Sequence, residues 1–590
     1  MQNIKDKSNS IGGYIWQEIL DQQKINYALS ISQKKNIPEI IARILVARGV
    51  TEAEVEDFLD PKIKNTLPDP LTLKDMDRCG EILVNAILSK QKIAIFGDYD
   101  VDGVCSSSIL SKFLENFAIE HEVYIPDRMY EGYGANETAL TELINKGYKL
   151  IILVDCGSGN IDLLRDVQKL NDIKIIVLDH HQIIDDLPDD LVVVNPNRID
   201  DFSGLGNLCA AGVVFMVLVH ISRLLRNSTN TNLPNLLELL DLVALATICD
   251  VMTLVGLNRS FVVSGLKIMH KLHNKGIAAL AKVARIGEPL NIYHCGFLLG
   301  PRINAGGRLR DAAQAVKLLT SNDKNIVEDI AEKLDKLNFQ RQSIQNLMIE
   351  QALVELDCME NKDSQNSCVI YNESWHIGLI GLVASRLKDK LFLPTIVIAP
   401  KNDGSAVGSG RSIAGFDLGK VIKEAVNLKL LEKGGGHAMA AGLTIKPEKI
   451  AEFRNWFEEK AAKIIPNLKS NRLLKIDAAL SASGANVNLV KMIEQAGPYG
   501  TGHPKPLFLF ASHKLANIHV ISNDHLILMI EDGFKKKLKI MAFNSLADDI
   551  KKFLLANEGS YLDFICNLSI NNYQFKENVI GFLVDVRTAN

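Results

Sequence analysis

The sequence predicts an α/β protein built on a doubly wound parallel sheet, with a second, smaller α/β domain and a C-terminal all-β barrel. Three short aliphatic runs, 92–96, 149–154 and 173–178, have the composition of strands that are buried on both faces of a parallel sheet. Helices are expected at 104–117 and 137–146. Their alternation with the runs is the order of a doubly wound domain.

The first part of the chain, residues 1–75, is predicted to be an N-terminal helical appendage. Apolar residues at Ile40, Ile41 and Ile44 have helical spacing, and several prolines mark the turns that follow them. The doubly wound domain is then expected to cover residues 76–320, with helices dominating its second half.

A long connecting helix is predicted over residues 321–361. The stretch 309–376 contains neither glycine nor proline, and apolar residues keep helical spacing across much of it. A smaller α/β domain is expected at 362–466. Its predicted elements are strands at 368–371 and 394–399 and a helix at 378–391.

The last segment, residues 467–590, is predicted to be a small antiparallel barrel, because short alternating runs replace the earlier aliphatic ones. These runs are 473–476, 507–510, 525–530, 538–543 and 579–586. No internal repeat accompanies the change of pattern.

Composition excludes several broad classes of protein. The longest apolar stretch, about 210–222, is too short to span a bilayer, and the N-terminus lacks a hydrophobic signal region, so a cytoplasmic protein without a membrane partner is expected. Nine cysteines without a CxxC pair indicate neither a disulfide framework nor a zinc knuckle. The 66 basic and 70 acidic residues nearly balance, which argues against a non-specific polycation that coats DNA.

An acidic cluster, Asp98-Tyr99-Asp100-Val101-Asp102-Gly103, follows the first aliphatic run. Carboxylates this close repel one another unless cations compensate them, so the spacing favours a metal site over a solvated turn. The pattern also matches the first half of a calcium-binding EF-hand loop. That loop would require a bidentate glutamate where the chain has Ile109, and a helix where the preceding segment is strand-like.

Asp155 and Asp179-His180-His181 follow the next two runs, so all three clusters are expected at the carboxyl ends of the strands, where ligands bind in such sheets. Carboxylates mixed with imidazole suit Mn²⁺ or Mg²⁺, and paired ions would activate a water and hold phosphate oxygens. Because adjacent side chains diverge, only one of the two histidines is expected to bind metal. Asp250, after the aliphatic run 240–249, indicates by itself a helix cap or turn.

In this order, Asp-Tyr-Asp-x-Asp-Gly, Asp-x-Gly and Asp-His-His resemble the DHH phosphoesterase superfamily. Three further motifs, at 300–308, 408–412 and 434–442, are similar to those of the RecJ family of bacterial single-stranded-DNA exonucleases. The resemblance runs from about Pro38 to the C-terminus. It implies a DHH domain, a DHHA1 domain joined to it by a long helix, and a C-terminal oligonucleotide-binding (OB) fold.

The resemblance also implies a set of metal ligands for two Mn²⁺ or Mg²⁺ ions. These are Asp98, Asp100, Asp102, Asp155, His180 and Asp250. Asp250 thereby gains a role beyond that of a cap. His181 becomes a candidate for contacting the scissile phosphate or transferring a proton, and Asp155 and Asp100 join it as catalytic candidates.

Residues that would bind the substrate follow from the same resemblance. Arg128 is expected to bind phosphate and Tyr133 to stack on a base, because a guanidinium binds phosphate bidentately and an aromatic face accepts any base. Ser409 and Arg411 resemble the rest of a 5′-phosphate pocket that faces Arg128 across a cleft. The structural alternative for each is an ordinary polar residue on the surface.

Two glycine-rich segments complete the predicted substrate contacts. Arg302, Asn304 and Arg308 are expected in a glycine-interrupted loop whose backbone approaches phosphate closely, the alternative being a plain turn with solvated arginines. His437 follows three glycines and is expected either to bind phosphate or to be a helix-entry residue. The chain departs from the usual family pattern at Ala210, Ala246, Gly306 and His503, and none of these positions is a predicted metal ligand.

The predicted function is a single-stranded-DNA-specific 5′-to-3′ exonuclease that releases nucleoside 5′-monophosphates. Family-level expectations are a role in DNA repair and recombination, with a single-strand-binding protein and a repair helicase as partners. Two alternatives are a DHH phosphodiesterase acting on oligoribonucleotides or cyclic dinucleotides, and a catalytically inactive DHH-related replication scaffold. DHH phosphodiesterases of small substrates are much shorter and lack the C-terminal barrel. The inactive replication scaffold has lost acidic ligands that this chain retains.

Overall fold

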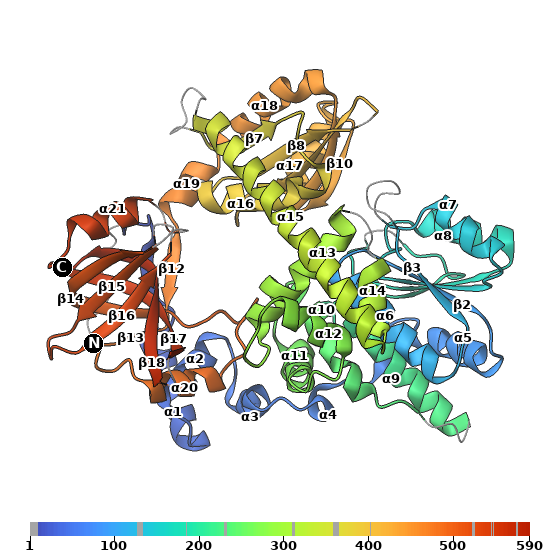
Figure 1. The fold of residues 1–590 in the computed structure, drawn as a ribbon, viewed down its shortest axis with the longest axis horizontal. Coiled ribbons are helices and arrows are strands. Elements are labelled where there is room, and N and C mark those ends of the chain that lie inside the picture. Colours follow the sequence, from blue (N-terminus) through green and yellow to red (C-terminus); the bar gives the residue numbers. More distant parts are fainter. Residues whose placement is uncertain are drawn as a thin grey trace. The chain divides into compact units, whose positions relative to one another are not determined.

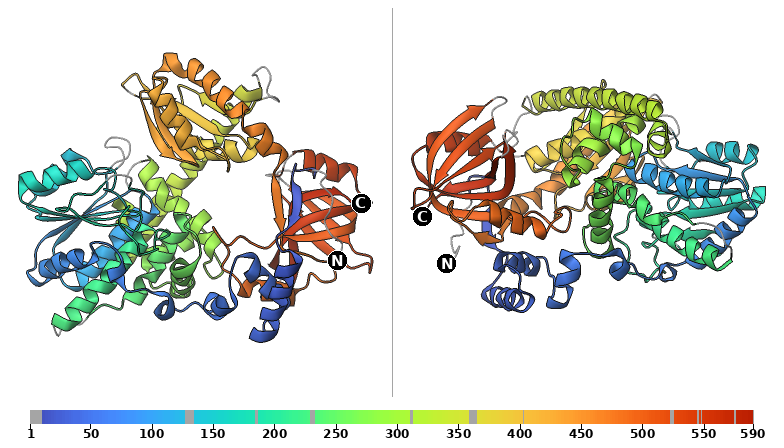
Figure 2. Two further views of the ribbon diagram at one scale, coloured as in Figure 1. Left: turned by 180° about the vertical axis from the view of Figure 1, so that it is seen from behind. Right: turned by 60° about the horizontal axis from the view of Figure 1, so that its bottom comes forward.

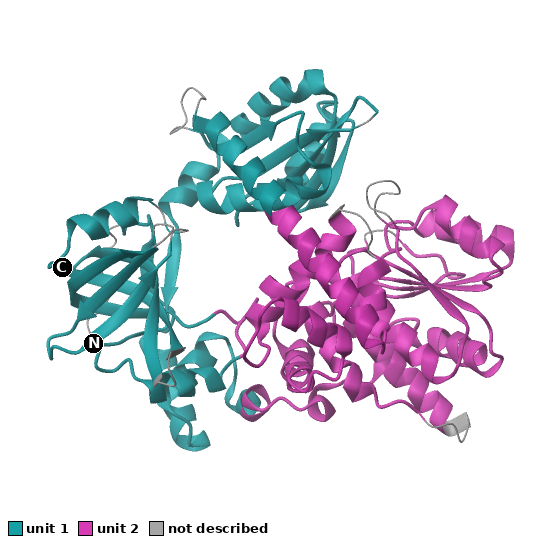
Figure 3. Cartoon of the chain, in the orientation of Figure 1, with its two compact units in different colours: residues 1–55, 343–497, 505–590 teal, residues 56–342, 498–504 magenta. Residues whose placement is uncertain are grey.

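The computed structural model describes residues 10–589 with several internal gaps. The residues left out are 127–133, 184–185, 229–232, 310–312, 358–364, 402, 522–524, 544–545, 547 and 574–575. The chain divides into two compact units (Figure 3). Unit 1 contains residues 1–55, 343–497 and 505–590, and unit 2 contains residues 56–342 and 498–504.

Unit 2 contains a five-stranded parallel sheet in the order β3-β2-β4-β5-β6. The strands are β2 (Ile93–Gly97), β3 (His121–Tyr124), β4 (Leu150–Val154), β5 (Lys174–Leu178) and β6 (Val192–Val194). All residues of β2 and β4 are buried, as their unbroken aliphatic sequences predict. The doubly wound sheet is confirmed. The sequence analysis missed β3, a half-exposed edge strand, and β6, which is only three residues long.

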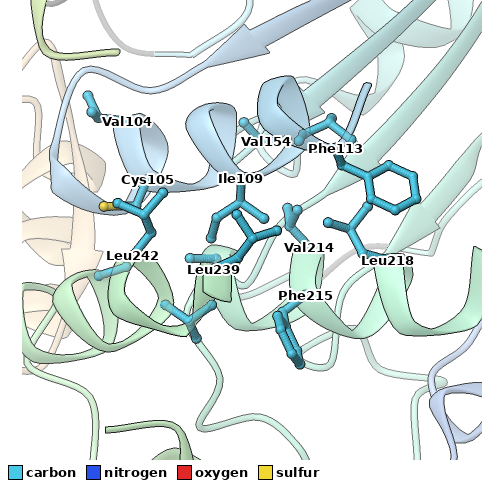
Figure 4. Close-up of a cluster of buried hydrophobic side chains, with 14 of the residues drawn as sticks. Val104, Cys105, Ile109, Phe113, Val154, Val214, Phe215, Leu218, Leu239 and Leu242 are labelled. Carbon is cyan, nitrogen blue, oxygen red and sulfur yellow. The ribbon is translucent and has the colours of Figure 1, made fainter. Parts of the chain in front are cut away.

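Helices cover both faces of this sheet (Figure 1). Alternate strand residues enter two separate cores: Ile93 and Ile95 join one, and Ala94 and Phe96 the other. The first core is shared with α5 (Met76–Leu88), α6 (Val101–Asn116) and α9 (Ala210–Ser228), and the second with α7 (Glu137–Asn145) and α8 (Ile161–Asn171). Figure 4 shows side chains of α6, among them Ile109 and Phe113, together with those of α9 in the first core.

Helices dominate the rest of the described part of unit 2. They include α4 (Ile63–Thr66), α10 (Leu240–Cys249), α11 (Gly256–Met269), α12 (Lys275–Val283), α13 (Gly300–Leu309) and α14 (Ala313–Thr320), with a π-helical turn, η4 (His294–Leu299), directly before α13. The long helix α15 (Lys324–Asp357) begins in unit 2 and ends in unit 1, and confirms the predicted connecting helix.

The predicted loop around Arg302, Asn304 and Arg308 is wrong, because these residues lie in helix α13. Gly300 and Gly307 allow neighbouring segments to pack closely against α13 and do not form a turn. A Cβ atom on Gly300 would lie 2.5 Å from Cys249 Sγ, and one on Gly307 would lie 2.8 Å from the carbonyl oxygen of Tyr99.

Helix α10 buries one carboxylate that lies outside the acidic clusters. Burial raises the pKa of Asp241 to about 6. Because the pKa of this carboxyl is higher in the folded protein, its charged form lowers the stability of the fold. This destabilisation is absent below the unfolded pKa of about 4 and complete above the folded pKa of about 6. Asp241→Asn is therefore expected to stabilise the protein by up to about 3 kcal/mol near pH 8, and by progressively less as the pH falls toward 4.

Urea denaturation at several pH values would measure this effect. Asp166→Asn, at an exposed position of α8, is the control and is expected to change stability by less than about 0.5 kcal/mol. An Asp241→Asn gain that is independent of pH would show that the carboxyl is not protonated on folding.

Unit 1 contains the second α/β sheet, in the order β10-β11-β9-β8-β7. Its strands are β7 (Cys368–Tyr371), β8 (Thr395–Pro400), β9 (Ala406–Arg411), β10 (Lys433–His437) and β11 (Ala440–Ile445), and its helices are α16 (Ile380–Leu391), α17 (Leu418–Asn427) and α18 (Ile450–Ala462). Ser409 and Arg411 lie in strand β9, and His437 ends strand β10. Of the two alternatives for His437, the structure excludes the helix-entry residue.

The C-terminal barrel is confirmed and has the topology of an OB fold. Its strands are β13 (Ala478–Ala479), β14 (Phe508–Ile521), β15 (His525–Glu531), β16 (Lys537–Ala542), β17 (Tyr561–Tyr573) and β18 (Lys576–Thr588). The pairing of β14 with β17 closes the sheet, β16 runs parallel to β18, and helix α21 (Asp548–Ala556) connects β16 to β17. The sequence analysis missed β17.

The predicted N-terminal appendage is only partly helical. Helices α1 (Gln22–Lys35) and α2 (Glu39–Ala47) follow a strand, β1 (Ile15–Glu18), which pairs in parallel with β12 (Leu473–Ile476). The run 473–476 therefore belongs to this two-stranded sheet and not to the barrel sheet. The buried carboxylate of Asp585 accepts a hydrogen bond from Trp16 Nε1 at 2.7 Å. The pairing joins segments about 460 residues apart, so no local pattern could predict it.

Shorter elements complete the described chain, whose ribbon Figure 2 shows from two further directions. They are α3 (Val55–Leu59), α19 (Ile465–Ser470) and α20 (Val487–Gln495), with 3₁₀ turns at Glu52–Glu54, Pro70–Thr72, Leu236–Leu239, Ile377–Leu379 and Pro447–Lys449. Among the described helices, none is both long and apolar enough to cross a bilayer.

Candidate metal centre

The acidic clusters meet at one edge of the sheet in unit 2. Asp98, Asp155 and Asp179 each follow the last residue of a strand, namely β2, β4 and β5. Strands β2 and β4 are neighbours, although β3 lies between them in sequence. The chain therefore reverses its winding direction at this point, and the carboxyl ends at such a switch point form the usual ligand site of a doubly wound sheet.

The first cluster surrounds the start of helix α6. Asp100 is the N-cap, and its side chain accepts hydrogen bonds from the amides of Asp102 at 2.9 Å and Gly103 at 3.2 Å. Asp102 is 1% exposed, and its two oxygens accept hydrogen bonds from the amides of Ala210 and Ala211 at the start of α9. Two helix N-termini thus hold these carboxylates in place, with the sign of charge that helix dipoles favour.

Two further carboxylates, Asp155 and Asp250, lie where their charged form is unfavourable. Burial, reinforced by Asp102 and Asp100, raises the pKa of Asp155 well above its usual value. The same causes raise the pKa of Asp250, the C-cap of α10, to about 8. Asp155 Oδ1 and Asp250 Oδ2 are both buried and accept no hydrogen bond from the described residues. A bound cation would stabilise both carboxylates in their charged form and would give their buried oxygens a partner.

His180 lies at the centre of the carboxylates. Its Nε2 is 3.3 Å from Asp155 Oδ1, 3.6 Å from Asp250 Oδ2 and 3.7 Å from Asp102 Oδ2. Three overlapping groups have ligand atoms within 4.8 Å of one another: Asp98, Asp100 and Asp155; Asp102, His180 and Asp250; and Asp155, His180 and His181. All six predicted metal ligands are thus brought together, and their mixture of oxygens with one or two imidazoles fits Mn²⁺ or Mg²⁺.

Asp179 orients His181. Its Oδ1 lies 2.7 Å from His181 Nδ1, and its two oxygens also accept hydrogen bonds from the amides of His180, His181 and Ser158. Burial opposes protonation of His181, but this hydrogen bond and the negative charge raise its pKa to about 9. The sequence analysis had given Asp179 no role of its own.

Two side-chain amides hold the backbone behind the two histidines. Asn195 Nδ2 donates to the carbonyl of His181 at 2.8 Å, and Asn197 Nδ2 donates to that of His180 at 2.6 Å. The sequence analysis missed both residues. The signal that could have revealed them is an Asn-Pro-Asn sequence directly after an apolar run.

The segment 498–504 supports the loop after Asp250. It follows α20 in sequence but belongs to unit 2. The amide of Leu254 donates to the carbonyl of Thr501 at 2.9 Å, and His503, which is buried, stacks on Tyr499 with ring centroids 4.7 Å apart. His503 is one of the positions where the chain departs from the usual family pattern, and it falls within the predicted barrel segment 467–590. The structure places it instead in the unit that carries the metal centre.

Gly103 allows the first cluster to form. A Cβ atom on Gly103 would lie 2.4 Å from the carbonyl oxygen of Asp98. Gly103→Ala is therefore expected to displace Asp98 or Asp100 and to lower Mn²⁺ affinity at least about 10-fold, as calorimetric titration would measure. Gly159→Ala is the control, because a Cβ atom there meets nothing within 4 Å. Equal affinities in the two variants would contradict this packing argument.

The predicted phosphate-binding residues of unit 2 differ in their surroundings. Arg302 forms an ion pair with Asp335 at 2.8 Å and donates to the carbonyl of Leu298, so its charge is largely used within the fold. Asn304 and Arg308 are half-buried on α13. The contact between Gly307 and Tyr99 places this part of α13 beside the first acidic cluster. Arg128 and Tyr133 lie outside the described residues.

Two of the predicted residues of unit 1, Ser409 and Arg411, form a compact polar group. Arg411 Nη1 donates to Ser409 Oγ at 3.1 Å. A Cβ atom on Gly381, in the first turn of α16, would lie 3.0 Å from Ser409 Oγ and 3.1 Å from Arg411 Nη2. His437 is exposed at the end of β10.

Comparisons with known proteins agree with this architecture. Models of the DHH family N-terminal domain, the DHHA1 domain and the RecJ OB domain match residues 92–247, 364–463 and 476–584. The single-stranded-DNA-specific exonuclease RecJ of Bacillus subtilis is 32% identical over 558 residues, which cover 94% of this chain and 68% of that protein. RecJ of Salmonella typhimurium is 33% identical over 523 residues, 86% of this chain and 89% of that protein.

Solved structures show the same similarity. The crystal structure of Thermus thermophilus RecJ in complex with Mn²⁺ superposes with a TM-score of 0.81 and 25% identity, covering 99% of this chain and 80% of that chain. An exonuclease RecJ bound to manganese gives a TM-score of 0.57 and 30% identity, covering 68% of this chain and 96% of that chain.

The fold and the carboxylate–histidine centre define a metal-dependent phosphoesterase of the DHH class. The DHHA1 and OB domains restrict the assignment further. This chain belongs to the RecJ family, whose curated members are named single-stranded-DNA-specific exonucleases.

Proposed function

We propose that this chain is a metal-dependent exonuclease that degrades single-stranded DNA from the 5′ end and releases nucleoside 5′-monophosphates. The observation that carries the proposal is the set of overlapping ligand groups that share Asp155 and His180, because two adjacent cations suit such a set. Family membership supports the substrate class, since the curated relatives are named for single-stranded DNA.

The chain's own groups would divide the chemistry between them. Two bound Mn²⁺ or Mg²⁺ ions would supply Lewis acidity and a water of lowered pKa. Asp155 and Asp100 would fix the reacting geometry, and His181, held by Asp179, would contact the scissile phosphate or pass a proton to the leaving oxygen. Hydrolysis between phosphorus and the 3′ oxygen of the terminal nucleotide leaves a 5′-phosphate on the shortened strand, ready for the next cycle.

The polar group of unit 1 supports a site for the 5′-phosphate. Ser409 and Arg411 offer a hydroxyl and a guanidinium, and Gly381 keeps the first turn of α16 close to both. We assign the 5′-phosphate to Ser409 and Arg411. Arg128 is proposed to bind phosphate as well, and Tyr133 to stack on a terminal base. Asn304, Arg308 and His437 are proposed to contact further phosphates, whereas the ion pair with Asp335 favours a structural role for Arg302.

The proposal extends to the setting of the enzyme. It would act in the cytoplasm, in DNA repair and recombination, with a single-strand-binding protein and a repair helicase. We propose the domain boundaries 1–75, 76–320, 321–361, 362–466 and 467–590.

Digestion of end-labelled DNA tests the activity. With Mn²⁺ or Mg²⁺, a 5′-labelled single strand should release labelled mononucleotide from the first turnover, while a 3′ label should stay on long products until late. Blunt duplex should be resistant. Early release of the 3′ label, or cleavage of dinucleotides and cyclic dinucleotides without cleavage of long strands, would contradict the proposal, as would the absence of any metal-dependent cleavage.

A further inference from the structure

Two exposed aromatic side chains lie on the segment that leads into α13. Tyr293, which precedes η4, and Phe297, within η4, stack on each other with ring centroids 5.2 Å apart and an interplanar angle of 24°. Tyr293 is 59% exposed and Phe297 is 65% exposed. The opposite side of the same segment is buried through Cys295 and Leu299. The two rings thus form a flat apolar surface that faces solvent.

The segment that carries these rings is attached to the metal centre at two places. Cys249, the neighbour of Asp250, donates to the carbonyl of Cys295 at 3.4 Å and touches Gly300. Further along, Gly307 packs against Tyr99, which lies between Asp98 and Asp100. At 1.5 Å per residue, Phe297 lies about 15 Å along the helix from Gly307, a distance that a few nucleotides of an extended strand can cover.

An exposed aromatic pair beside a phosphodiester-cleaving centre suits one kind of occupant. Each nucleobase has a flat π-face, so aromatic side chains bind single strands without reading their sequence. In a duplex the bases are stacked inside the double helix and cannot reach the two rings. Such a surface therefore selects for single strands.

We propose that Tyr293 and Phe297 form a base-stacking platform for nucleotides on the 3′ side of the scissile phosphodiester. The proposal rests on the proposed function and adds a binding site to it. The platform holds the part of the strand that remains after each cut, so it contributes to the binding of long substrates and not to the chemical step.

The test compares substrate lengths in the full-length protein. The Tyr293→Ala/Phe297→Ala variant is expected to raise the KM for a 5′-phosphorylated strand of about 12 nucleotides by about 5-fold or more, with kcat unchanged. Cleavage of a 5′-phosphorylated dinucleotide should be unaffected. Tyr293→Phe should retain wild-type behaviour, because the ring remains. Phe202→Ala is the control, since Phe202 is 92% exposed in the same unit and has no assigned role.

Binding without turnover supplies a second readout. In EDTA, a strand carrying 2-aminopurine a few nucleotides from its 5′ end should be quenched by the wild type through stacking, and much less by the double variant. The platform would be overturned if the double variant lost activity equally on the dinucleotide and on the long strand, or if it quenched 2-aminopurine as the wild type does. It would also be overturned if Phe202→Ala showed the same defect as the double variant. A wild type that binds and quenches but does not cut would refute the proposed function alone. A wild type that does not bind single strands would refute both.

Discussion

Asp155→Asn is expected to abolish metal-dependent cleavage of single-stranded DNA while leaving DNA binding intact. Asp155 takes part in two of the three ligand groups, so its loss disrupts both sides of the centre. A decrease in kcat of at least about 1000-fold is expected, because removing electrostatic stabilisation of the transition state has effects of this order. Asparagine is the appropriate replacement, since Asp155 has φ +61° and asparagine tolerates this conformation.

The same substitution should increase the stability of the metal-free protein. The raised pKa of Asp155 reflects burial next to other carboxylates, and an amide removes that cost. Melting curves in EDTA should therefore shift upward, while the stabilisation by added Mn²⁺ should shrink. Asp172→Asn is the matched control, because Asp172 is an exposed aspartate with φ +47°. Undiminished digestion by Asp155→Asn in Mn²⁺ would refute the assignment of the centre.

Substitutions of His180 and His181 are expected to separate metal binding from chemistry. His180→Ala should lower Mn²⁺ affinity more than about 100-fold, because its Nε2 lies among three carboxylates and loss of a ligand exceeds the cost of outer-shell changes. His181→Ala should retain most of the affinity and lower kcat by about 100- to 10000-fold, the usual range for loss of a proton-transferring group.

Asp179→Asn completes this comparison. It leaves both imidazoles present but weakens the hydrogen bond to His181 Nδ1, so it should resemble His181→Ala in kcat and not His180→Ala in affinity. Electron paramagnetic resonance of free Mn²⁺ measures the affinities directly, independently of catalysis. Equal losses of Mn²⁺ affinity in His180→Ala and His181→Ala would show that both histidines are ligands, as one of the three geometric groups allows.

Much of the fold was predictable because its signals are local. The buried strands β2, β4 and β5 are continuous aliphatic runs, and the 34 residues of α15 lie in a stretch without glycine or proline. The acidic clusters follow those strands directly. The rules of parallel sheets then place them at one edge without any knowledge of side-chain positions.

Errors arose where the same residue types serve different local structures. Glycines at 300, 306 and 307 suggested a loop, but in α13 Gly300 and Gly307 allow the helix to approach Cys249 and Tyr99. The glycines of 434–436 likewise form strand β10, against which α17 packs. A glycine signals either a special backbone conformation or the absence of a side chain, and only the neighbouring segments decide between them.

By itself, the sequence determined the doubly wound domain, the long helix and the barrel, because strand burial and helical spacing are properties of short segments. Charge spacing also predicted a metal site at the strand ends, whereas the choice of Asp250 as an expected ligand came from the family resemblance. The tertiary structure decided what those segments meet. It placed His180 among Asp102, Asp155 and Asp250, gave Asp179 its hold on His181, brought residues 498–504 behind the Asp250 loop, and left Tyr293 and Phe297 stacked in solvent. The surroundings of His180 and the position of residues 498–504 join segments far apart in the chain, and packing alone creates them.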